Sequence, residues 1–532
     1  MPFEKYRSHP GRQMIPIIDI FAGPGGLGEG FSSLLDRNQD PVFKIRLSIE
    51  KEENAHRTLT LRAFFRQFER GKVPKEYYEV LRGESTIENL YRAHPVQAAK
   101  AKSEAVMATL GPESWEAISN KIKKALGGAR DWLLIGGPPC QAYSLVGRAR
   151  NKAKEGYKPQ EDEKHFLYQE YLRILSSFWP AVFVMENVKG LLSSKPDPKK
   201  DPIFAQIISD LSAPAESENF HSNGRKEKHT YKLYSLSPNR SLGEPIGKDF
   251  VLRAEEHGIP QARHRVIIVG VRDDIDADGP TALGIQDPIP LAKVLAQMPP
   301  LRSGITDAVD SDEIWIQLLK QACERRWFRM IEKNGPEGIF ELATEILDSI
   351  EVPESRRGSE FVPWKPEVEY RSDWYLDPKL AGYCNHSARG HITKDIYRYF
   401  YSACFAALYN VSPTLADFPV DLLPNHANAA SAIAKSNMFL DRFRVQPWGR
   451  SSTTITSHIS KDGHYYIHPD PSQARSLTVR EAARLQSFPD NYFFTGPRTA
   501  QYIQVGNAVP PLLARMIAES VAKLFEPPKE RR

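Results

Sequence analysis

The chain has 532 residues, which gives room for two or more domains. Hydrophobic residues make up 41% of it and charged residues 26%, as in an ordinary soluble globular protein. The first residues, MPFEKYRSHPGRQ, contain no apolar signal core, and no apolar run reaches the roughly 18 residues that a membrane-spanning helix needs. The net charge of +5 is compatible with a polyanionic partner but does not identify one.

None of the cysteines belongs to a C-x-x-C pair, so the sequence predicts no structural zinc site and no bound metal. We expect a cytoplasmic protein, because a reducing compartment suits free thiols. The four cysteines are Cys140, Cys323, Cys384 and Cys404.

The first half of the chain alternates apolar strand patterns with helical patterns, which predicts an α/β fold with a mainly parallel sheet covered by helices. The predicted strands are 15–21, 43–50, 131–136, 181–185 and 265–271, with 230–236 and 249–254 as an antiparallel pair. Helical patterns cover 52–68 and 96–126.

The alternation stops after residue 271, and residues 272 to about 440 are rich in Pro, Trp and charged residues. This change predicts a second, smaller domain. We expect a helix over 477–486, with Thr478 as its N-cap, and another over 508–524, with Pro510 and Pro511 in its first turn. The predicted division is 1–271, 272–475 and 476–532, where the last segment returns to the first domain and 440–475 forms a connecting hairpin with Asp462-Gly463 at its turn.

A glycine-rich turn follows the first predicted strand. Gly23, Gly25 and Gly28 satisfy the G-x-G-x-x-G pattern, and Glu50 ends the next strand. Glycines let the backbone approach a ligand, and an acid at the second strand can bind ribose hydroxyls. The pattern therefore predicts an adenosine-type cofactor without saying which one, and a tight turn without a ligand remains the alternative.

Two reactive groups follow two later strands. The segment DWLLIGGPPCQ places Cys140 just after a buried strand, and Glu186-Asn187 follows the strand AVFVM. A nicotinamide enzyme would need a hydride-transfer site at this edge, whereas a thiol and a carboxylate suit attack on a pyrimidine ring. An inert buried cysteine and a surface carboxylate are the plain alternatives.

With DIFAGPGG at 19–26, PPCQ at 138–141 and ENV at 186–188, the chain resembles the cytosine-5 DNA methyltransferases. QARHR at 261–265 looks like the Q-x-R-x-R segment of that family, and RSLTVREAARLQSFPD at 475–490 and QVGNAVP at 504–510 look like its last two blocks. Six blocks in family order span residues 17 to about 515. The resemblance implies a Rossmann-like S-adenosylmethionine-dependent methyltransferase sheet, with a target-recognition domain in the segment where the composition changes.

The resemblance also implies a mechanism. The Cys140 thiolate would add to carbon 6 of cytosine, so that carbon 5 can attack a sulfonium methyl group. Glu186 would protonate or hydrogen-bond ring nitrogen 3, and Asn187 would hold the turn. Arg263 and Arg265 would steady the cytosine and the Glu186 carboxylate.

The implied cofactor is S-adenosylmethionine, with Glu50 on its ribose. Lys51 stands where many members of the family have an aromatic or apolar residue, so the adenine would be held differently here. Glu84 is the nearest match to the acid that follows the third strand in that family. The other implied cofactor-binding residues are Phe21, Ala22, Gly23, Gly25, Gly26, Leu27, Pro138, Leu167 and Asn507.

Residues 141–164 look like the mobile loop that closes over DNA in this family. A duplex base must leave the stack to meet a thiol, and basic side chains in such a loop would meet phosphates. A solvated charged loop is the alternative. The implied DNA-binding residues are Gln141, Ser144, Arg148 and Arg150, and Lys152 and Lys154 would also meet phosphates.

Two further groups are weaker. His464 and His468 are predicted to share one face of a hairpin strand rather than to bind a metal, and the aromatic residues around 364–401 are predicted to pack in a core. His386 and Arg389, in the segment NHSAR, are polar enough to touch DNA but receive no assigned role.

The sequence thus predicts a DNA cytosine-5 methyltransferase that acts as a monomer on duplex DNA, in the manner of the modification enzyme paired with a restriction endonuclease. Three alternatives stay open: methylation of transfer RNA by the same chemistry, a catalytically dead binding protein, and a nicotinamide dehydrogenase.

Overall fold

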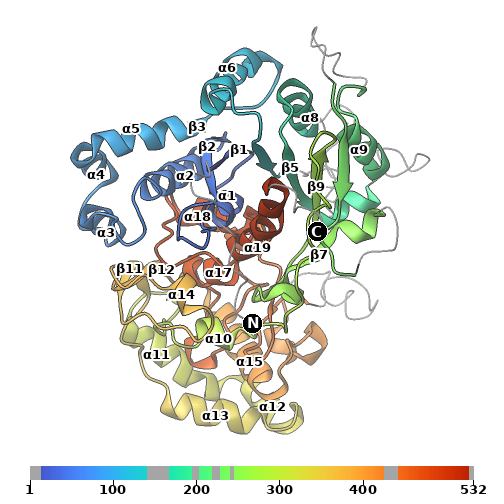
Figure 1. The fold of residues 1–532 in the computed structure, drawn as a ribbon. Helices are drawn as coiled ribbons and strands as arrows, with labels where there is room; N and C mark the ends of the chain where they lie inside the picture. Colours follow the sequence, from blue (N-terminus) through green and yellow to red (C-terminus); the bar gives the residue numbers. More distant parts are fainter. Residues whose placement is uncertain are drawn as a thin grey trace.

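The computed structural model describes residues 14–139, 167–194, 203–217, 228–239, 245–424 and 441–526. Its centre is an eight-stranded sheet in the order β3-β2-β1-β4-β5-β9-β6, with β7 also paired to β9 (Figure 1). The first five strands of this order run parallel, and β9 runs antiparallel to its neighbours. The strands are β1 (Ile15–Ile20), β2 (Phe43–Glu50), β3 (Ala105–Met107), β4 (Leu133–Gly136), β5 (Val182–Val188), β6 (Tyr231–Tyr234), β7 (Val251–Arg253) and β9 (His264–Arg272).

Helices cover both faces of this sheet, because the strands are apolar on both sides. Ile15 and Ile17 of β1 face a core that includes α1 (Gly26–Ser32) and α19 (Pro511–Ala522). Ile18 and Ile20 face the opposite core, with α6 (Trp115–Leu126), α8 (Leu167–Phe178) and α9 (Ile203–Ser212). The predicted fold class, a Rossmann-like α/β sheet of the methyltransferase type, is confirmed.

Four helices lie beyond the β3 edge of the sheet and enclose a small core of their own (Figure 1). They are α2 (Glu53–Phe65), α3 (Lys75–Leu81), α4 (Ile87–Ala93) and α5 (Pro95–Glu104). The sequence pattern missed β3, which lies inside the stretch predicted as helical. Three residues are too few to show a period of two, so the strand is defined only by its pairing with β2.

The predicted pairing of 230–236 with 249–254 is wrong. Both segments hydrogen-bond to β9 instead, β6 to its end at 269–272 and β7 to its start at 264–266. β6 and β7 follow one another along the chain, but each pairs with a different part of the long strand β9. Strand propensity alone does not reveal this pairing.

Residues 304–422 and 443–474 contribute to a separate, mainly helical core at the lower side of the molecule (Figure 1). Trp315, Trp327 and Phe400 are among its buried residues. The predicted core packing is confirmed for Tyr397, Tyr399 and Tyr401 in this core and for Trp374 in the core that includes α1 and α19, whereas Trp364 is only partly buried against the latter. The elements of this part are β10 (Gly304–Ile305), α11 (Asp312–Lys320), α12 (Arg326–Asn334), α13 (Ile339–Ser349), β11 (Gly358–Pro363), α14 (Ser372–Tyr375), β12 (Gly382–Ser387), β13 (Gly390–His391) and α15 (Thr393–Tyr409).

The hairpin predicted around Asp462-Gly463 is wrong. The segment before the turn contains the 3-10 helix η10 (Ser457–Ser460), and Ile467 makes only isolated bridges with Val445 and Ser476. Upstream, β14 (Ser452–Thr453) pairs in parallel with β8 (Gln261–Ala262).

The C-terminal segment returns to the sheet through α17 (Val479–Leu485), α18 (Arg498–Asn507) and α19. The predicted N-cap is confirmed, because the Thr478 hydroxyl accepts from the Glu481 backbone N–H and the Glu481 carboxylate accepts from that of Thr478. A Cβ at Gly30 of α1 would lie 2.4 Å from the Ala514 side chain, so α1 and α19 are in close contact. In the part of the chain that the structure describes, no helix is long and apolar enough to cross a membrane.

Candidate active site

The glycine-rich turn joins β1 to α1 at the carboxyl edge of the sheet. Phe21, Gly23 and Gly25 all have left-handed backbone conformations, with φ of 55°, 57° and 98°. A Cβ at Gly23 would meet no atom of the described residues within 4 Å, whereas one at Gly25 or Gly26 would collide with packed neighbours. The turn is therefore packed on its inner side and open beside Gly23, where a ligand can approach the backbone.

The Glu50 carboxylate is fixed beside this turn. Its Oε2 accepts the Gly23 N–H at 2.8 Å, and its Oε1 accepts the N–H groups of Lys51 and Glu52 at 2.9 and 2.8 Å. The side chain of Lys51 points into solvent. An open glycine backbone next to a carboxylate held by amides fits an adenosine-type cofactor with ribose hydroxyls.

The other predicted cofactor-binding residues surround the same edge in different ways. The Ala22 N–H donates to the Ile49 carbonyl at 3.1 Å, and the Leu27 side chain is buried in the core behind the turn. Pro138 is buried just after β4, Leu167 begins α8, and Asn507 is the exposed last residue of α18.

Glu84 is not the acid after the third strand. It lies in the turn between α3 and α4, where its two carboxylate oxygens accept hydrogen bonds from Nε and Nη2 of Arg82 at 2.7 and 2.9 Å. The third strand along the chain, β3 at the edge of the sheet, ends at Met107, and no carboxylate follows it directly, since the next residues read Ala-Thr-Leu-Gly.

Glu186 and Arg265 form an ion pair at the ends of β5 and β9. Arg265 Nε lies 2.9 Å from Glu186 Oε1, and the two side chains are 12% and 13% exposed. The register of β5 against β9 brings these two side chains together, because Val188 is opposite Arg265 and Glu186 is opposite Ile267, two residues along each strand. Both groups are thus partly desolvated and still reach the surface.

The turn after β4 lies directly against this ion pair. A Cβ at Gly137 would be 2.8 Å from Glu186 Oε2, and the Asn187 amide donates to the Pro138 carbonyl at 3.3 Å. Pro139 is the last described residue of this segment. The predicted residues Cys140, Gln141, Ser144, Arg148 and Arg150 lie outside the described residues.

Arg263 lies apart from that ion pair. Its side chain is buried, and its guanidinium donates to the carbonyls of Ile455 at 2.8 Å and Gly506 at 3.1 Å. Burial, followed by the nearby charge of Arg265, lowers the pKa of Arg263 well below its usual range. Arg263 joins the β8 region to the 455 segment and to α18, and of the two arginines it is Arg265 that forms the ion pair with Glu186.

A cavity of about 320 Å³ opens beside Arg265. The sequence patterns did not single out three polar residues in the wall of this cavity, Lys189, His264 and Thr454. Lys189 directly follows the recognised ENV block, and His264 lies within the Q-x-R-x-R block. One of them, His264, has its Nε2 2.7 Å from Glu255 Oε1. The lining residues are Val188, Lys189, Gly190, Ala262, His264, Arg265 and Thr454.

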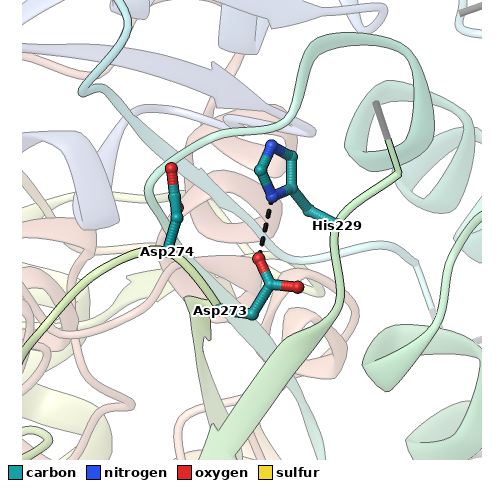
Figure 2. A group of neighbouring side chains, drawn as sticks. All are labelled: His229, Asp273 and Asp274. Atoms are coloured by element: carbon teal, nitrogen blue, oxygen red, sulfur yellow. Dashed lines mark hydrogen bonds and ion pairs between the residues drawn. The ribbon is translucent and has the colours of Figure 1, made fainter. Parts of the chain in front are cut away.

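One group of possible metal ligands gathers elsewhere, among the described residues, at the far end of β9 (Figure 2). His229 Nδ1 lies 2.8 Å from Asp273 Oδ1, and the other Asp273 oxygen accepts from the Thr230 backbone at 2.9 Å. Asp274 pairs with Arg272 at 2.5 and 3.1 Å. His229 bonds to Asp273, and Asp274 bonds to Arg272, where β6 pairs with β9. We therefore interpret these groups as a structural network.

His464 and His468 do not share a strand face. His464 Nδ1 lies 2.7 Å from the Tyr399 hydroxyl, whereas His468 is buried beside Glu481, with 3.7 Å between His468 Nε2 and Glu481 Oε1. His386 and Arg389 are also buried, the first in β12 and the second directly before β13.

The sheet order, the open glycine turn and the carboxylate–guanidinium pair at neighbouring strand ends define a methyltransferase of the Rossmann-like class. The family model of C-5 cytosine-specific DNA methylases matches residues 118–213 and 248–523. The chain is 32% identical to the type II methyltransferase M.Bpa9945I of Bacillus paralicheniformis, over 95% of this chain and 98% of that protein.

Two further relatives are similar over much of their length. Identity is 26% to the type II methyltransferase M.AgeI of Thalassovita gelatinovora, over 95% of this chain and 98% of the relative. It is 27% to M.DdeI of Desulfomicrobium norvegicum, over 74% and 73%. The chain belongs to the C-5 cytosine-specific DNA methylases. It is therefore a DNA methyltransferase, as the sequence blocks predicted, and the dehydrogenase and the inert binding protein are set aside.

Proposed function

We propose that the chain transfers a methyl group from S-adenosylmethionine to carbon 5 of a cytosine flipped out of a specific duplex sequence, through a covalent adduct with Cys140. The ion pair between Glu186 and Arg265, beside the turn that leads to Cys140, is the observation that carries the proposal. Relatives that are named type II methyltransferases support a role as the modification enzyme beside a restriction endonuclease.

In the proposed reaction the Cys140 thiolate bonds to carbon 6, and the displaced electron pair makes carbon 5 nucleophilic. Glu186 in its protonated form donates a hydrogen bond or its proton to ring nitrogen 3, where negative charge would otherwise develop. Arg265 keeps the Glu186 carboxylate in place, since its nitrogen already lies 2.9 Å from that oxygen. Carbon 5 would take the methyl group, with S-adenosylhomocysteine as the leaving group, and loss of the carbon 5 proton to a base would then expel the thiolate and restore the aromatic ring.

S-adenosylmethionine would supply the electrophilic methyl group on its sulfonium. Glu50 would bind its ribose hydroxyls, and the open backbone at Gly23 would let it approach the turn. We assign the surrounding positions to the same role: Phe21, Ala22, Gly25, Gly26, Leu27, Pro138, Leu167 and Asn507.

Duplex DNA would enter between the two cores. We assign residues 272–475 to target recognition and residues 1–271 with 476–532 to catalysis, because a separate helical core occupies most of the first range. Gln141, Ser144, Arg148 and Arg150 would contact the DNA from the loop after Cys140. Lys189 and His264, in the wall of the cavity beside Arg265, add polar groups on the same side.

A covalent trap tests this proposal. Sequencing of 5-methylcytosine in DNA from cells that express the chain gives the target sequence. A duplex of that sequence with 5-fluorocytosine at the target should then form a stable adduct on Cys140, because fluorine cannot leave as a proton does. Mass spectrometry of a tryptic digest locates the adduct, and C140A should bind cofactor but form none. An adduct on another residue, or methylation of transfer RNA in place of duplex DNA, would contradict the proposal.

A further inference from the structure

The C-terminal return holds the glycine-rich turn from its buried side. The Tyr492 hydroxyl donates a hydrogen bond to the carbonyl of Pro24, which lies between the two left-handed glycines of the turn. Tyr492 is fully buried, and burial raises the pKa of its phenol well above the ordinary range, so the phenol keeps its proton. The contact joins residues from opposite ends of the chain.

This hydrogen bond fixes one peptide plane of the turn. The N–H of the Pro24–Gly25 peptide donates to the Ala22 carbonyl at 2.9 Å, and its carbonyl accepts from Tyr492. A Cβ at Gly25 would lie 2.9 Å from the Tyr492 hydroxyl and 2.8 Å from Leu59. Because both ends of the peptide are bonded, it cannot rotate without breaking a buried hydrogen bond.

Tyr492 itself is held rigidly. Its carbonyl accepts from Arg480 at 2.6 Å, and its N–H donates to the Pro489 carbonyl at 3.0 Å. Its ring contacts Phe488, with ring centres 4.7 Å apart, and the Arg62 guanidinium lies 4.8 Å from the ring centre. Arg480 also donates to the Cys384 carbonyl of β12 at 2.8 Å, so the tyrosine is supported from the recognition side as well.

We infer that Tyr492 is a positioning residue for the cofactor: its hydroxyl sets the backbone of the turn beside Gly23 in the binding conformation before the cofactor arrives. The inference rests on the proposed use of S-adenosylmethionine. Without the hydroxyl, the buried Pro24 carbonyl loses its donor and the turn gains other conformations, which binding must then reorder. Loss of one such bond should weaken cofactor binding about three- to tenfold.

Calorimetric titration with S-adenosylmethionine and S-adenosylhomocysteine tests this on the full chain with Y492F, which removes one oxygen and keeps the ring. Y502F is the matched control, since the Tyr502 phenol is equally buried and donates to the Leu477 carbonyl at 2.7 Å, away from the turn. Y492F should weaken both ligands about three- to tenfold and Y502F by less than twofold. In turnover, the KM for the cofactor should rise while kcat and the KM for DNA stay near wild type.

Hydrogen exchange provides a second measurement that needs no ligand. The peptide that covers residues 21–29 should exchange faster in Y492F than in wild type and unchanged in Y502F, and a low temperature keeps a weakened variant folded during labelling. Equal affinities and equal exchange in Y492F and wild type would overturn the inference. If wild type itself bound no S-adenosylmethionine, the proposed function would fail instead, and exchange alone would still decide the role of Tyr492 in the turn.

Discussion

Glu186 and Arg265 face each other across the antiparallel pair of β5 and β9, with 2.9 Å between the carboxylate oxygen and the guanidinium nitrogen. E186Q keeps the shape of the side chain but removes the charge. We expect kcat to fall about 10²- to 10⁴-fold with an unchanged melting temperature, because a general acid or base contributes that much. R265K should lower kcat about 10²-fold, since a lysine cannot reproduce the planar donor.

Initial rates on duplex DNA at saturating cofactor measure both effects. R253Q is the control, because exposed Arg253 lies on β7 beside the same strand and, among the described residues, its side chain pairs with half-buried Glu256. Full activity of E186Q would remove this carboxylate from the chemistry.

Asp19 predicts a loss of stability as pH rises from the acidic to the neutral range. Its carboxyl is buried in β1, and neither oxygen has a hydrogen-bond partner among the described residues. Burial raises its pKa from 3.8 to about 8, against a lowering by Arg66, with smaller increases from Glu50 and Glu104. The folded state therefore binds a proton that the unfolded state releases, and the stability from this group falls as pH rises from about 4 to 8.

D19N should abolish this part of the slope. Between pH 5 and 8, we expect the free energy of unfolding of wild type to fall by about 3 kcal/mol relative to that of D19N, because one pKa unit corresponds to about 1.36 kcal/mol. Urea unfolding at several pH values measures the difference. Parallel stability profiles for the two proteins would contradict the prediction.

His386 predicts the opposite slope at acid pH. Its Nδ1 lies 2.9 Å from the Thr478 hydroxyl and its Nε2 lies 3.2 Å from the Pro299 carbonyl, which suits a neutral ring with the proton on Nε2. Burial lowers its pKa from 6.5 to about 4, and it lowers the pKa of buried His468 to about 4 as well. The unfolded state binds these protons first, so stability falls as pH drops from about 6.5 to 4.

H386Q should remove the contribution of one histidine to that acid slope, while His468 and buried His391, whose pKa burial also lowers, continue to contribute. For one histidine, the free energy of unfolding should change by about 3 kcal/mol as pH drops from about 6.5 to 4. H94Q is the control, since His94 is part-exposed beside Glu76. An acid slope that stays the same in H386Q would show that His386 does not carry it.

Gly30 predicts an overpacking defect. A Cβ there would lie 2.4 Å from both the Ala514 side chain and the Pro511 carbonyl, and neither can move without shifting α19. G30A should therefore lower the free energy of unfolding by about 1–3 kcal/mol and weaken cofactor binding, because α1 carries the glycine turn. G284A, with open space around its Cβ, should be neutral in thermal and denaturant unfolding.

Local signals in the sequence predicted the features whose cause is local. The Thr478 N-cap depends only on its own hydroxyl and the first helical turn, and Glu186 was placed by the apolar run before it, although β5 continues to Val188. The Asp462-Gly463 hairpin failed because tertiary contacts decide that segment. The Tyr466 hydroxyl bonds to Thr454 and Thr456, and the Leu477 N–H takes the Tyr466 carbonyl.

The cavity beside Arg265 could not be predicted from local patterns. It requires the parallel pairing of Ser452 with Gln261, which brings Thr454 next to Ala262. Two-residue strands have no detectable period, and the partners are far apart in sequence. The different contacts of Arg263 and Arg265 could not be predicted from local patterns either, since they depend on which arginine donates to the carbonyls of Ile455 and Gly506.

The contact between α1 and α19 has a consequence for biosynthesis. The glycine-rich turn leaves the ribosome long before the groups that pack beneath it, because these groups, from Tyr492 to Ala514, come much later in the chain. A nascent polypeptide that has exposed the whole of β1 to β9 should therefore remain unable to retain the methyl donor, so that no partly synthesised enzyme competes for it.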